Sequence, residues 1–161
     1  MKNQFIFTNP DRLIDGDLEL VLTKTTPADL VKGYVPGYEF EMRNPGKTIH
    51  IGSIRLRIGS VKKLYYAGHI GYAVNEEYRG HRYAARSCQL ILPLAYTHGL
   101  KAVWLTVDPT NIPSQKTCEI IEAKYMETVR IPKDHEMYQE GARYRRRYRV
   151  DLRGLIQLIG D

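Results

Sequence analysis

Cysteine is scarce in this sequence: Cys88 and Cys118 are the only two among 161 residues, and they form no CxxC motif. The chain therefore has neither a disulfide scaffold nor a cysteine-based zinc site. No apolar run approaches the roughly 20 residues that a membrane-spanning helix needs. The first residues, MKNQFIFTNPDR, lack the apolar core of a signal peptide. We expect a cytoplasmic protein that binds no membrane and no metal.

The composition is that of an ordinary globular protein, with 43% hydrophobic and 26% charged residues. Its length predicts a single domain over residues 1–161. The net charge is +6, and the segment Arg143–Arg149, RYRRRYR, holds five arginines in seven residues. These arginines could bind nucleic-acid phosphates. Because no helix-turn-helix or ribonucleoprotein motif is present and tyrosines alternate with the arginines, we favour a solvated edge strand or a strand at a homodimer interface.

Hydrophobic periodicity predicts a mixed α/β fold. A slip of the apolar phase at Gly52-Ser53 predicts a β-bulge there. The link from strand 66–74 to strand 101–107 passes through a helix, so these two strands should be parallel neighbours. The prediction is a mostly antiparallel sheet that contains one parallel pair. Strands are expected at 18–24, 38–43, 48–58, 66–74, 101–107, 124–131 and 143–152, with a short helix at 26–33 and longer helices at 83–98 and 111–123.

The strongest chemical signal lies at Val74–Arg86, VNEEYRGHRYAAR, where a predicted strand runs through a glycine-containing loop into a long helix. The first turn of a helix has free N–H groups and a partial positive charge, which suit a phosphate or pyrophosphate. Arg79 and Arg82 add full positive charge beside it. The segment is either a pyrophosphate site built from the amides of residues 80–84 or a plain basic helix start. Walker and Rossmann glycine motifs are absent.

Two motifs resemble the GNAT superfamily of acyl-CoA-dependent N-acyltransferases. RGHRYA is similar to the family's [QR]-x-x-G-x-[GA] signature, and DPTNIPSQKTCE is similar to its N-x-x-[AS]-x-x-x-x-E segment. The resemblance implies a GNAT-like fold, which is a central, mostly antiparallel twisted sheet with a parallel pair at the cofactor site. It also implies acetyl-CoA as cosubstrate, and a strand over residues 72–74 that pairs with the pantetheine arm and stabilises the oxyanion. The cofactor-binding residues that it implies are Tyr72, Ala73, Val74, Arg79, Gly80, His81, Arg82, Tyr83, Ala84, Asn111 and Ser114.

The sequence departs from the family pattern at three positions. Arg82 replaces the internal glycine, Cys118 replaces a tyrosine that is the general acid in many relatives, and Thr106 replaces a glutamate. A helical first turn needs no positive φ, so we expect Arg82 to be accommodated there. Its guanidinium either pairs with phosphate or is merely tolerated at this position.

Several side chains are candidates for the acid–base chemistry. Glu39 and Glu41 share the polar face of a strand and could act as base or bind a cationic amine, or they form a solvated sheet face. Cys118 could donate a proton or be a buried apolar residue. Tyr72 is a further candidate donor, and His50 and His69 have suitable intrinsic pKa values. The candidate catalytic residues are Tyr72, Glu39, Glu41 and Cys118.

The resemblance implies an N-acetyltransferase in which a primary amine attacks the thioester of acetyl-CoA directly in a ternary complex. We expect a small-molecule or peptide acceptor. Because Asp134, Glu136 and Glu140 make the segment PKDHEMYQEGA acidic, this acceptor should be a cation. Two alternatives remain open: a GNAT-like module that binds acyl-CoA without catalysis, and a basic RNA-associated domain.

Overall fold

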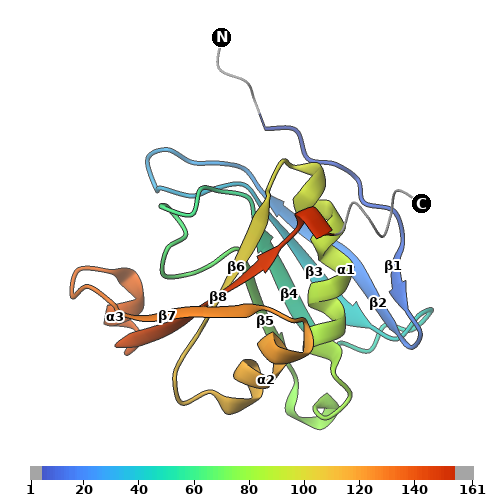
Figure 1. The fold of residues 1–161 in the computed structure, drawn as a ribbon. Coiled ribbons are helices and arrows are strands. Elements are labelled where there is room, and N and C mark those ends of the chain that lie inside the picture. The colour runs from blue at the N-terminus through green and yellow to red at the C-terminus, as the bar shows by residue number, and fades with distance from the viewer. Residues whose placement is uncertain (1–4, 155–161) are drawn as a thin grey trace.

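The computed structural model describes residues 5–154, which form two antiparallel sheets and a long covering helix (Figure 1). The first sheet contains five strands in sequence order, and the second has the order β6-β8-β7. Helix α1 crosses one face of the larger sheet. The strands are β1 (Leu13–Asp15), β2 (Leu18–Thr26), β3 (Gly37–Arg43), β4 (Gly52–Arg57), β5 (Ile70–Val74), β6 (Ala102–Val107), β7 (Lys124–Arg130) and β8 (Tyr144–Asp151); the helices are α1 (Tyr83–Thr97), α2 (Ile112–Ile120) and α3 (Glu136–Gln139), with a 3-10 turn at Glu76–Tyr78.

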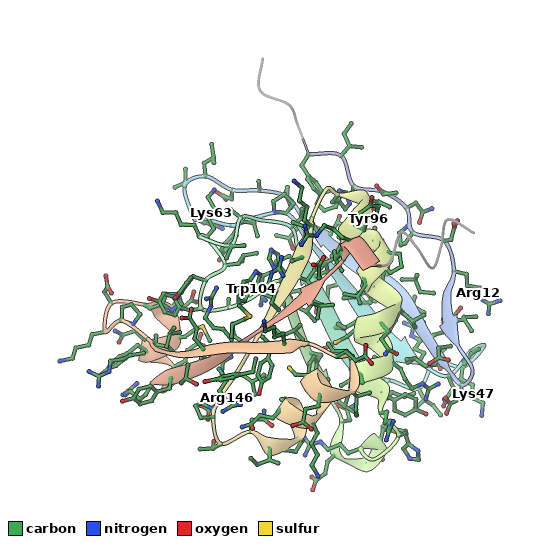
Figure 2. All side chains as sticks on the ribbon, viewed as in Figure 1. Arg12, Lys47, Lys63, Tyr96, Trp104 and Arg146 are labelled. Atoms are coloured by element: carbon green, nitrogen blue, oxygen red, sulfur yellow. The ribbon has the colours of Figure 1, made fainter. Side chains whose placement is uncertain are left out.

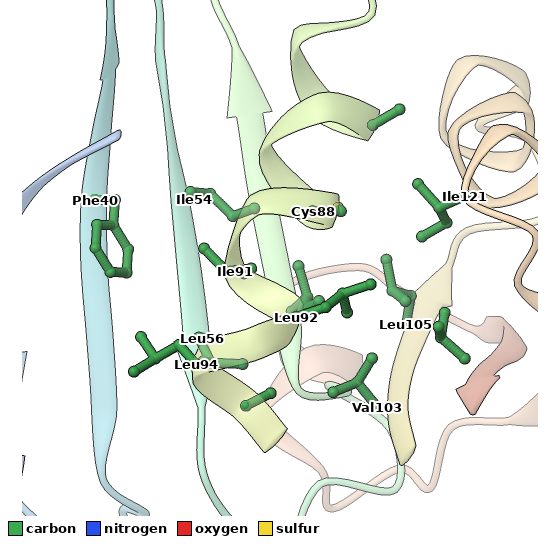
Figure 3. Close-up of a cluster of buried hydrophobic side chains, with 14 of the residues drawn as sticks. Phe40, Ile54, Leu56, Cys88, Ile91, Leu92, Leu94, Val103, Leu105 and Ile121 are labelled. Atoms are coloured by element: carbon green, nitrogen blue, oxygen red, sulfur yellow. The ribbon is translucent and has the colours of Figure 1, made fainter. Parts of the chain in front are cut away.

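The core lies between α1 and the sheets (Figure 3). Strand β3 shows why: Tyr38, Phe40 and Met42 are buried against the helix side, whereas Glu39 and Glu41 alternate onto the other face. The predicted alternation is therefore confirmed. Buried apolar side chains of α1, β4 and β6 complete the packing, among them Ile91, Leu92, Leu94, Ile54, Leu56, Val103 and Leu105.

The mixed α/β class and the antiparallel pairing are confirmed, but the single central sheet and its parallel pair are not. Within residues 5–154 every strand ladder is antiparallel, and β5 and β6 belong to different sheets. The crossover rule applies to two strands of one sheet. Here β5 and β6 separate after a local contact at Gly68 and Leu105, so they form no ladder and the rule does not apply to them.

The predicted helix at residues 26–33 is wrong, because this segment reverses direction in a tight turn. Asp29 and Tyr34 exchange backbone hydrogen bonds of 3.0 and 2.9 Å. The Asp29 carboxylate also accepts hydrogen bonds from the backbone N–H groups of Val31 and Lys32. Such local side-chain acceptance competes with helix formation, and Gly33 completes the turn at φ +74°.

The predicted bulge at Gly52-Ser53 is also wrong, because β4 simply begins at Gly52. Its register with β3 is regular from Met42↔Gly52 to Gly37↔Arg57. The slip in the apolar phase marks the point where the preceding segment, residues 48–51, joins the strand.

The arginine-rich segment forms β8, which lies between β6 and β7 and is not an edge strand. Arg147 shows how the fold accommodates this charge. Its guanidinium is buried, contacts the Glu127 carboxylate at 2.6 Å, and stacks on the rings of Tyr65 and Trp104. The prediction of a solvated edge strand was wrong because β7, which precedes β8 in the chain, pairs along the outside of β8. No helix within residues 5–154 is both long and apolar enough to cross a membrane.

Candidate active site

The two sheets are tied together by His69, just before β5 begins. Its backbone N–H donates to the Trp104 carbonyl at 2.7 Å, and its Nδ1 accepts from the Trp104 N–H at 2.9 Å. Its Nε2 then donates to the Gly59 carbonyl at 2.9 Å. Burial lowers the pKa of His69, which favours the neutral form that these bonds require. His69 therefore acts as a structural link rather than as a general base.

Beyond this link, β5 presents a backbone edge that no described strand pairs. The Arg57 N–H donates to the His69 carbonyl, and the Asn75 N–H donates to the Ile51 carbonyl. Because hydrogen-bonded positions alternate along an antiparallel pair, Gly71 and Ala73 direct their backbone groups toward β4. The backbone groups of Tyr72 and Val74 therefore point to the opposite edge, toward β6.

A cavity of about 830 Å³ extends from the gap between β5 and β6 across the outer face of the larger sheet. Tyr72 lines it on one side and Thr106 on the other. Asn111 and Ser114, at the start of α2, also contribute to its wall. Asn111 caps α2, since its Oδ1 accepts from the Ser114 N–H at 3.2 Å. Two positions predicted from the family pattern thus lie beside the gap between the sheets.

Tyr72 holds a proton inside this gap. Its hydroxyl oxygen is buried and has no hydrogen-bond partner among residues 5–154. Burial raises the pKa of Tyr72, and the neighbouring Ser114 and Thr117 side chains oppose this shift in part. The phenol therefore stays protonated at neutral pH and is available as a donor.

The other three candidate catalytic residues differ in their access to the cavity. Glu39 lines it and lies 3.4 Å from the Arg55 guanidinium. Glu41 does not line it: its carboxylate contacts Arg43 and His50 at 3.0 Å each. The hydrogen bond from Arg43, with that from His50, lowers the pKa of Glu41, which weakens it as a base.

Cys118 is fully buried and lies outside the cavity wall. Burial raises the pKa of this thiol to about 12. The structure therefore brings Tyr72 and Glu39 to one cavity and leaves Glu41 and Cys118 outside it.

The loop that leads into α1 has two left-handed residues. Gly80 has φ +93° and Arg82, the residue before the helix, has φ 59°. The expectation that Arg82 needs no positive φ was wrong, because it occupies the cap position outside the helix and not the first turn. This conformation suits the glycine that the family motif has there. No side chain caps α1, so the first N–H groups of this helix are free of side-chain partners.

The remaining loop residues contribute backbone groups or charge. The Tyr83 hydroxyl donates to Asp17 at 2.7 Å, which directs this side chain away from the loop. The backbone amides of Tyr83 and Ala84 belong to the free first turn. Arg79 and His81 are exposed, and Arg79 donates to the Val74 carbonyl at 3.2 Å.

Sequence reasoning missed the basic side of the cavity. Six basic residues line it against four acidic ones: Lys24, Lys32, Arg55, Arg57, Lys63 and Arg145 against Glu39, Asp108, Glu136 and Glu140. Asp134 is not among the lining residues. The alternation in β4 held a signal, because Arg55 and Arg57 share the face of Glu39. Within residues 5–154 no group of three or more His, Cys, Asp or Glu side chains could hold a metal ion.

Known proteins share this fold. No curated protein matches the sequence. Among solved structures, a GNAT-family acetyltransferase from Bacillus anthracis is 20% identical, with a TM-score of 0.57, over 71% of this chain and 66% of its own. The chain thus spans just under two thirds of that relative. RimL, a ribosomal L7/L12 alpha-N-protein acetyltransferase in complex with coenzyme A, is 11% identical, with a TM-score of 0.63, over 88% of this chain and 98% of its own.

A third solved structure is the spermidine/spermine N-acetyltransferase SpeG from Vibrio cholerae, which is 14% identical, with a TM-score of 0.56, over 75% of this chain and 68% of its own. At these identities the structures establish a shared fold. The family model for the acetyltransferase (GNAT) domain matches residues 17–124. Since this match covers more than half of the sequence, the chain belongs to the GNAT acetyltransferase family.

Proposed function

We propose that this protein is a single-domain cytoplasmic enzyme that transfers an acetyl group from acetyl-CoA to a primary amine. One observation carries the proposal: the unpaired edge of β5 faces a gap that opens into the cavity, and the buried, protonated Tyr72 lies in that gap. The edge offers backbone donors, and the cavity has room for an acceptor. Family membership and the coenzyme A complex of RimL support the choice of cosubstrate.

The residues present fit acetyl-CoA at three places. The free first turn of α1, with Arg79 and Arg82 beside it, suits the pyrophosphate. The backbone groups of Tyr72 and Val74 suit the amides of the pantetheine arm, whereas those of Ala73 are directed to β4. Asn111 and Ser114 lie beside the gap. Bound acetyl-CoA would supply the thioester, whose carbonyl carbon forms the new C–N bond as the C–S bond breaks.

Side chains of the gap and of the wider cavity would then contribute to different steps of the transfer. A backbone N–H of Tyr72 or Val74 would stabilise negative charge on the carbonyl oxygen. The Tyr72 phenol would give its proton to the departing thiolate, the role that a tyrosine at the Cys118 position has in many relatives. Glu39 would hold the acceptor ammonium and remove a proton from it. Glu136 and Glu140 add negative charge to the same cavity. We infer a small-molecule or peptide amine as the acceptor.

Replacing Tyr72 by phenylalanine tests the catalytic assignment. Loss of a general acid typically costs about 100-fold or more in rate, so Tyr72→Phe should lower kcat for CoA-thiol release by about 100-fold. The Kd for CoA, measured by calorimetry, should change little because the backbone edge remains. Tyr96→Phe is the control, since Tyr96 lies near the end of α1 (Figure 2) and does not line the cavity.

Two outcomes would contradict the proposal. Unchanged kcat in Tyr72→Phe would remove the phenol from the mechanism. Tight CoA binding without thiol release, across amino acids, polyamines, aminoglycosides and peptides, would favour a module that binds acyl-CoA without catalysis.

A further inference from the structure

Two arginines of the cavity wall have no carboxylate partner among residues 5–154. Arg57 comes from β4 of the larger sheet and Arg145 from β8 of the smaller one. Among residues 5–154, Arg57 makes one long hydrogen bond, 3.4 Å from its Nη1 to the Gly68 carbonyl. A Cβ at Gly71 would lie 3.6 Å from both terminal nitrogens of Arg57. The guanidinium therefore lies over β5, beside the position of Tyr72.

Arg145 has even fewer polar partners among residues 5–154 than Arg57 has. Its Nε is buried and has no hydrogen-bond partner within residues 5–154, and no carboxylate lies within ion-pair distance there. The nearby Asp108 carboxylate forms no ion pair with Arg145, and one of its oxygens accepts from the backbone N–H and the hydroxyl of Thr110 at 2.9 and 2.7 Å. Its negative charge opposes only in part the lowering of the Arg145 pKa that burial causes. Burial lowers the pKa of Arg145 and also that of Arg57, where the neighbouring Arg55 adds to the shift.

Two other arginines with little solvent exposure, both outside the cavity wall, have carboxylate partners. Arg147, two residues along β8, has the Glu127 carboxylate at 2.6 Å. Arg86 on α1 contacts Asp15 and Asp17 at 2.7 Å each. A buried charge without a partner is costly, and the cost falls when an opposite charge arrives. Arg57 and Arg145 are half-buried and have no ion-pair partner among residues 5–154, so a bound anion would stabilise both.

The charge balance of the cavity favours the same conclusion. Its six basic residues outnumber its four acidic ones, and Glu39 is already shared with Arg55. A ligand that carried positive charge alone would leave the basic excess uncompensated. A ligand with an ammonium and an anionic group would satisfy both kinds of wall residue.

We propose that Arg57 and Arg145 bind an anionic group of the acceptor, a carboxylate or a phosphate, so that the acceptor carries this anion together with its reactive amine. The inference rests on the proposed acetyl transfer for the role of the ligand, but the anion site itself does not depend on that activity. Guanidinium groups suit both anions, because their fork of N–H donors binds two oxygens at once.

Matched pairs of acceptors test the proposal by turnover. An amino acid is compared with its amide, and an aminoalkyl phosphate with the corresponding amino alcohol, with CoA-thiol release as the readout. In at least one pair the anionic member should have a kcat/KM about 10-fold or more higher, and the preferred pair distinguishes carboxylate from phosphate. Arg57→Gln and Arg145→Gln should each remove this preference while leaving kcat/KM for the neutral member nearly unchanged.

Arg149→Gln is the matched control, because Arg149 is on the same strand as Arg145 but does not line the cavity. Arg57→Lys keeps the charge without the fork, so it should retain part of the preference. Equal kcat/KM for both members of every pair would overturn the proposal. A preference for the anionic member that persists unchanged in both glutamine variants would overturn the assignment to these arginines.

A binding measurement separates this proposal from the proposed catalysis. Inorganic phosphate is titrated by calorimetry into protein that holds excess CoA, which occupies the pyrophosphate loop. We expect binding that both glutamine variants weaken about 10-fold and the Arg149 variant retains. Arginine-dependent phosphate binding without thiol release from any amine would uphold the anion site and reject the catalysis. Thiol release without acceptor preference and without phosphate binding would uphold the catalysis and reject the anion site.

Discussion

Glu39 and Glu41 lie two residues apart on one face of β3, yet their surroundings give them different capacities. Glu39 faces the cavity and shares its charge with Arg55 across a 3.4 Å contact. Glu41 is held by Arg43 and His50, and these contacts lower its pKa. A carboxylate that is already paired on two sides makes a weak base and a weak site for an additional ammonium. The sequence alone placed both on the same face and could not separate them.

This difference predicts unequal effects of removing each charge. Glu39→Gln should raise the acceptor KM by about 10-fold, since a charge-assisted hydrogen bond contributes about 1.5 kcal/mol or more. The KM for acetyl-CoA should stay close to that of the unmodified protein. Glu41→Gln serves as the matched control and should leave both KM values nearly unchanged. Steady-state kinetics with both substrates varied measures this. Equal effects of the two substitutions would contradict the assignment of Glu39 to the acceptor.

Arg82 combines an unfavourable backbone conformation with a favourable charge. The left-handed region costs a non-glycine residue about 1–2 kcal/mol. Replacement by glycine or by alanine removes the guanidinium in both cases, but only glycine relieves the backbone. The free energy of unfolding of Arg82→Gly should therefore be about 1 kcal/mol higher than that of Arg82→Ala, as measured by denaturant titration.

Both substitutions should also weaken CoA binding by about 10-fold or more, through loss of a charge-assisted bond to the pyrophosphate. Calorimetry with CoA and dephospho-CoA locates the loss at the pyrophosphate rather than at the 3′-phosphate. If both variants bind CoA as tightly as the unmodified protein, Arg82 is tolerated at this position and makes no phosphate contact.

At the scale of elements, β4 and β5 pack closely because of one glycine. A Cβ added at Gly52 would lie 2.3 Å from the carbonyl oxygen of Ala73 and 3.0 Å from the Cα of Val74. Both are backbone atoms and cannot rotate away. Gly52→Ala should destabilise the fold by about 2–3 kcal/mol, in the upper range for an overpacked core.

Gly71→Ala is the matched control within the same pair of strands. Its Cβ would meet only the flexible Arg57 guanidinium at 3.6 Å, an ordinary contact. The free energy of unfolding of this variant should lie within about 1 kcal/mol of that of the unmodified protein. Denaturant titration of both variants tests the comparison, and a Gly52 variant as stable as the Gly71 variant would show that β5 can shift without cost.

Local patterns predicted the elements that depend on local chemistry. The alternation of Tyr38, Phe40 and Met42 located the buried face of β3, and Asn111 with Ser114 located the start of α2. The turn at Asp29 was missed because its side-chain hydrogen bonds compete with a helical pattern that looks equally good in sequence. The positions of β8 and of the two unpartnered arginines depend on which strands pair across the molecule. Sequence spacing does not encode that pairing.

At the scale of the whole molecule, the gap between β5 and β6 separates two sheets that meet through His69 and Trp104. The cavity extends from this gap over the outer face of the larger sheet, and the turn at residues 29–34 contributes Lys32, Gly33 and Tyr34 to its wall. The exposed strand β7 forms the outer edge of the smaller sheet. A homodimer remains a prediction, and its interface would have to use a surface other than the enclosed strand β8.

A ligand that bridges the gap should stabilise both sheets together. Acetyl-CoA at about 100 times its Kd should add about 2.7 kcal/mol to the free energy of unfolding. For a domain of this size, that corresponds to a rise in Tm of about 5–10 °C. Arg79→Gln should reduce this rise, because it removes charge beside the pyrophosphate without altering the fold.

The same measurement addresses the RNA-associated alternative. Only part of the arginine-rich segment is available to RNA phosphates, because Arg147 is buried and paired with Glu127 and Arg145 lines the cavity. A single-stranded RNA oligonucleotide should therefore leave Tm unchanged at physiological salt. If RNA instead raised Tm, with a rise that fell steeply as salt increased, while acetyl-CoA had no effect, the acetyltransferase proposal would fail. Counterion release would then identify phosphate contacts on the surface as the basis of binding.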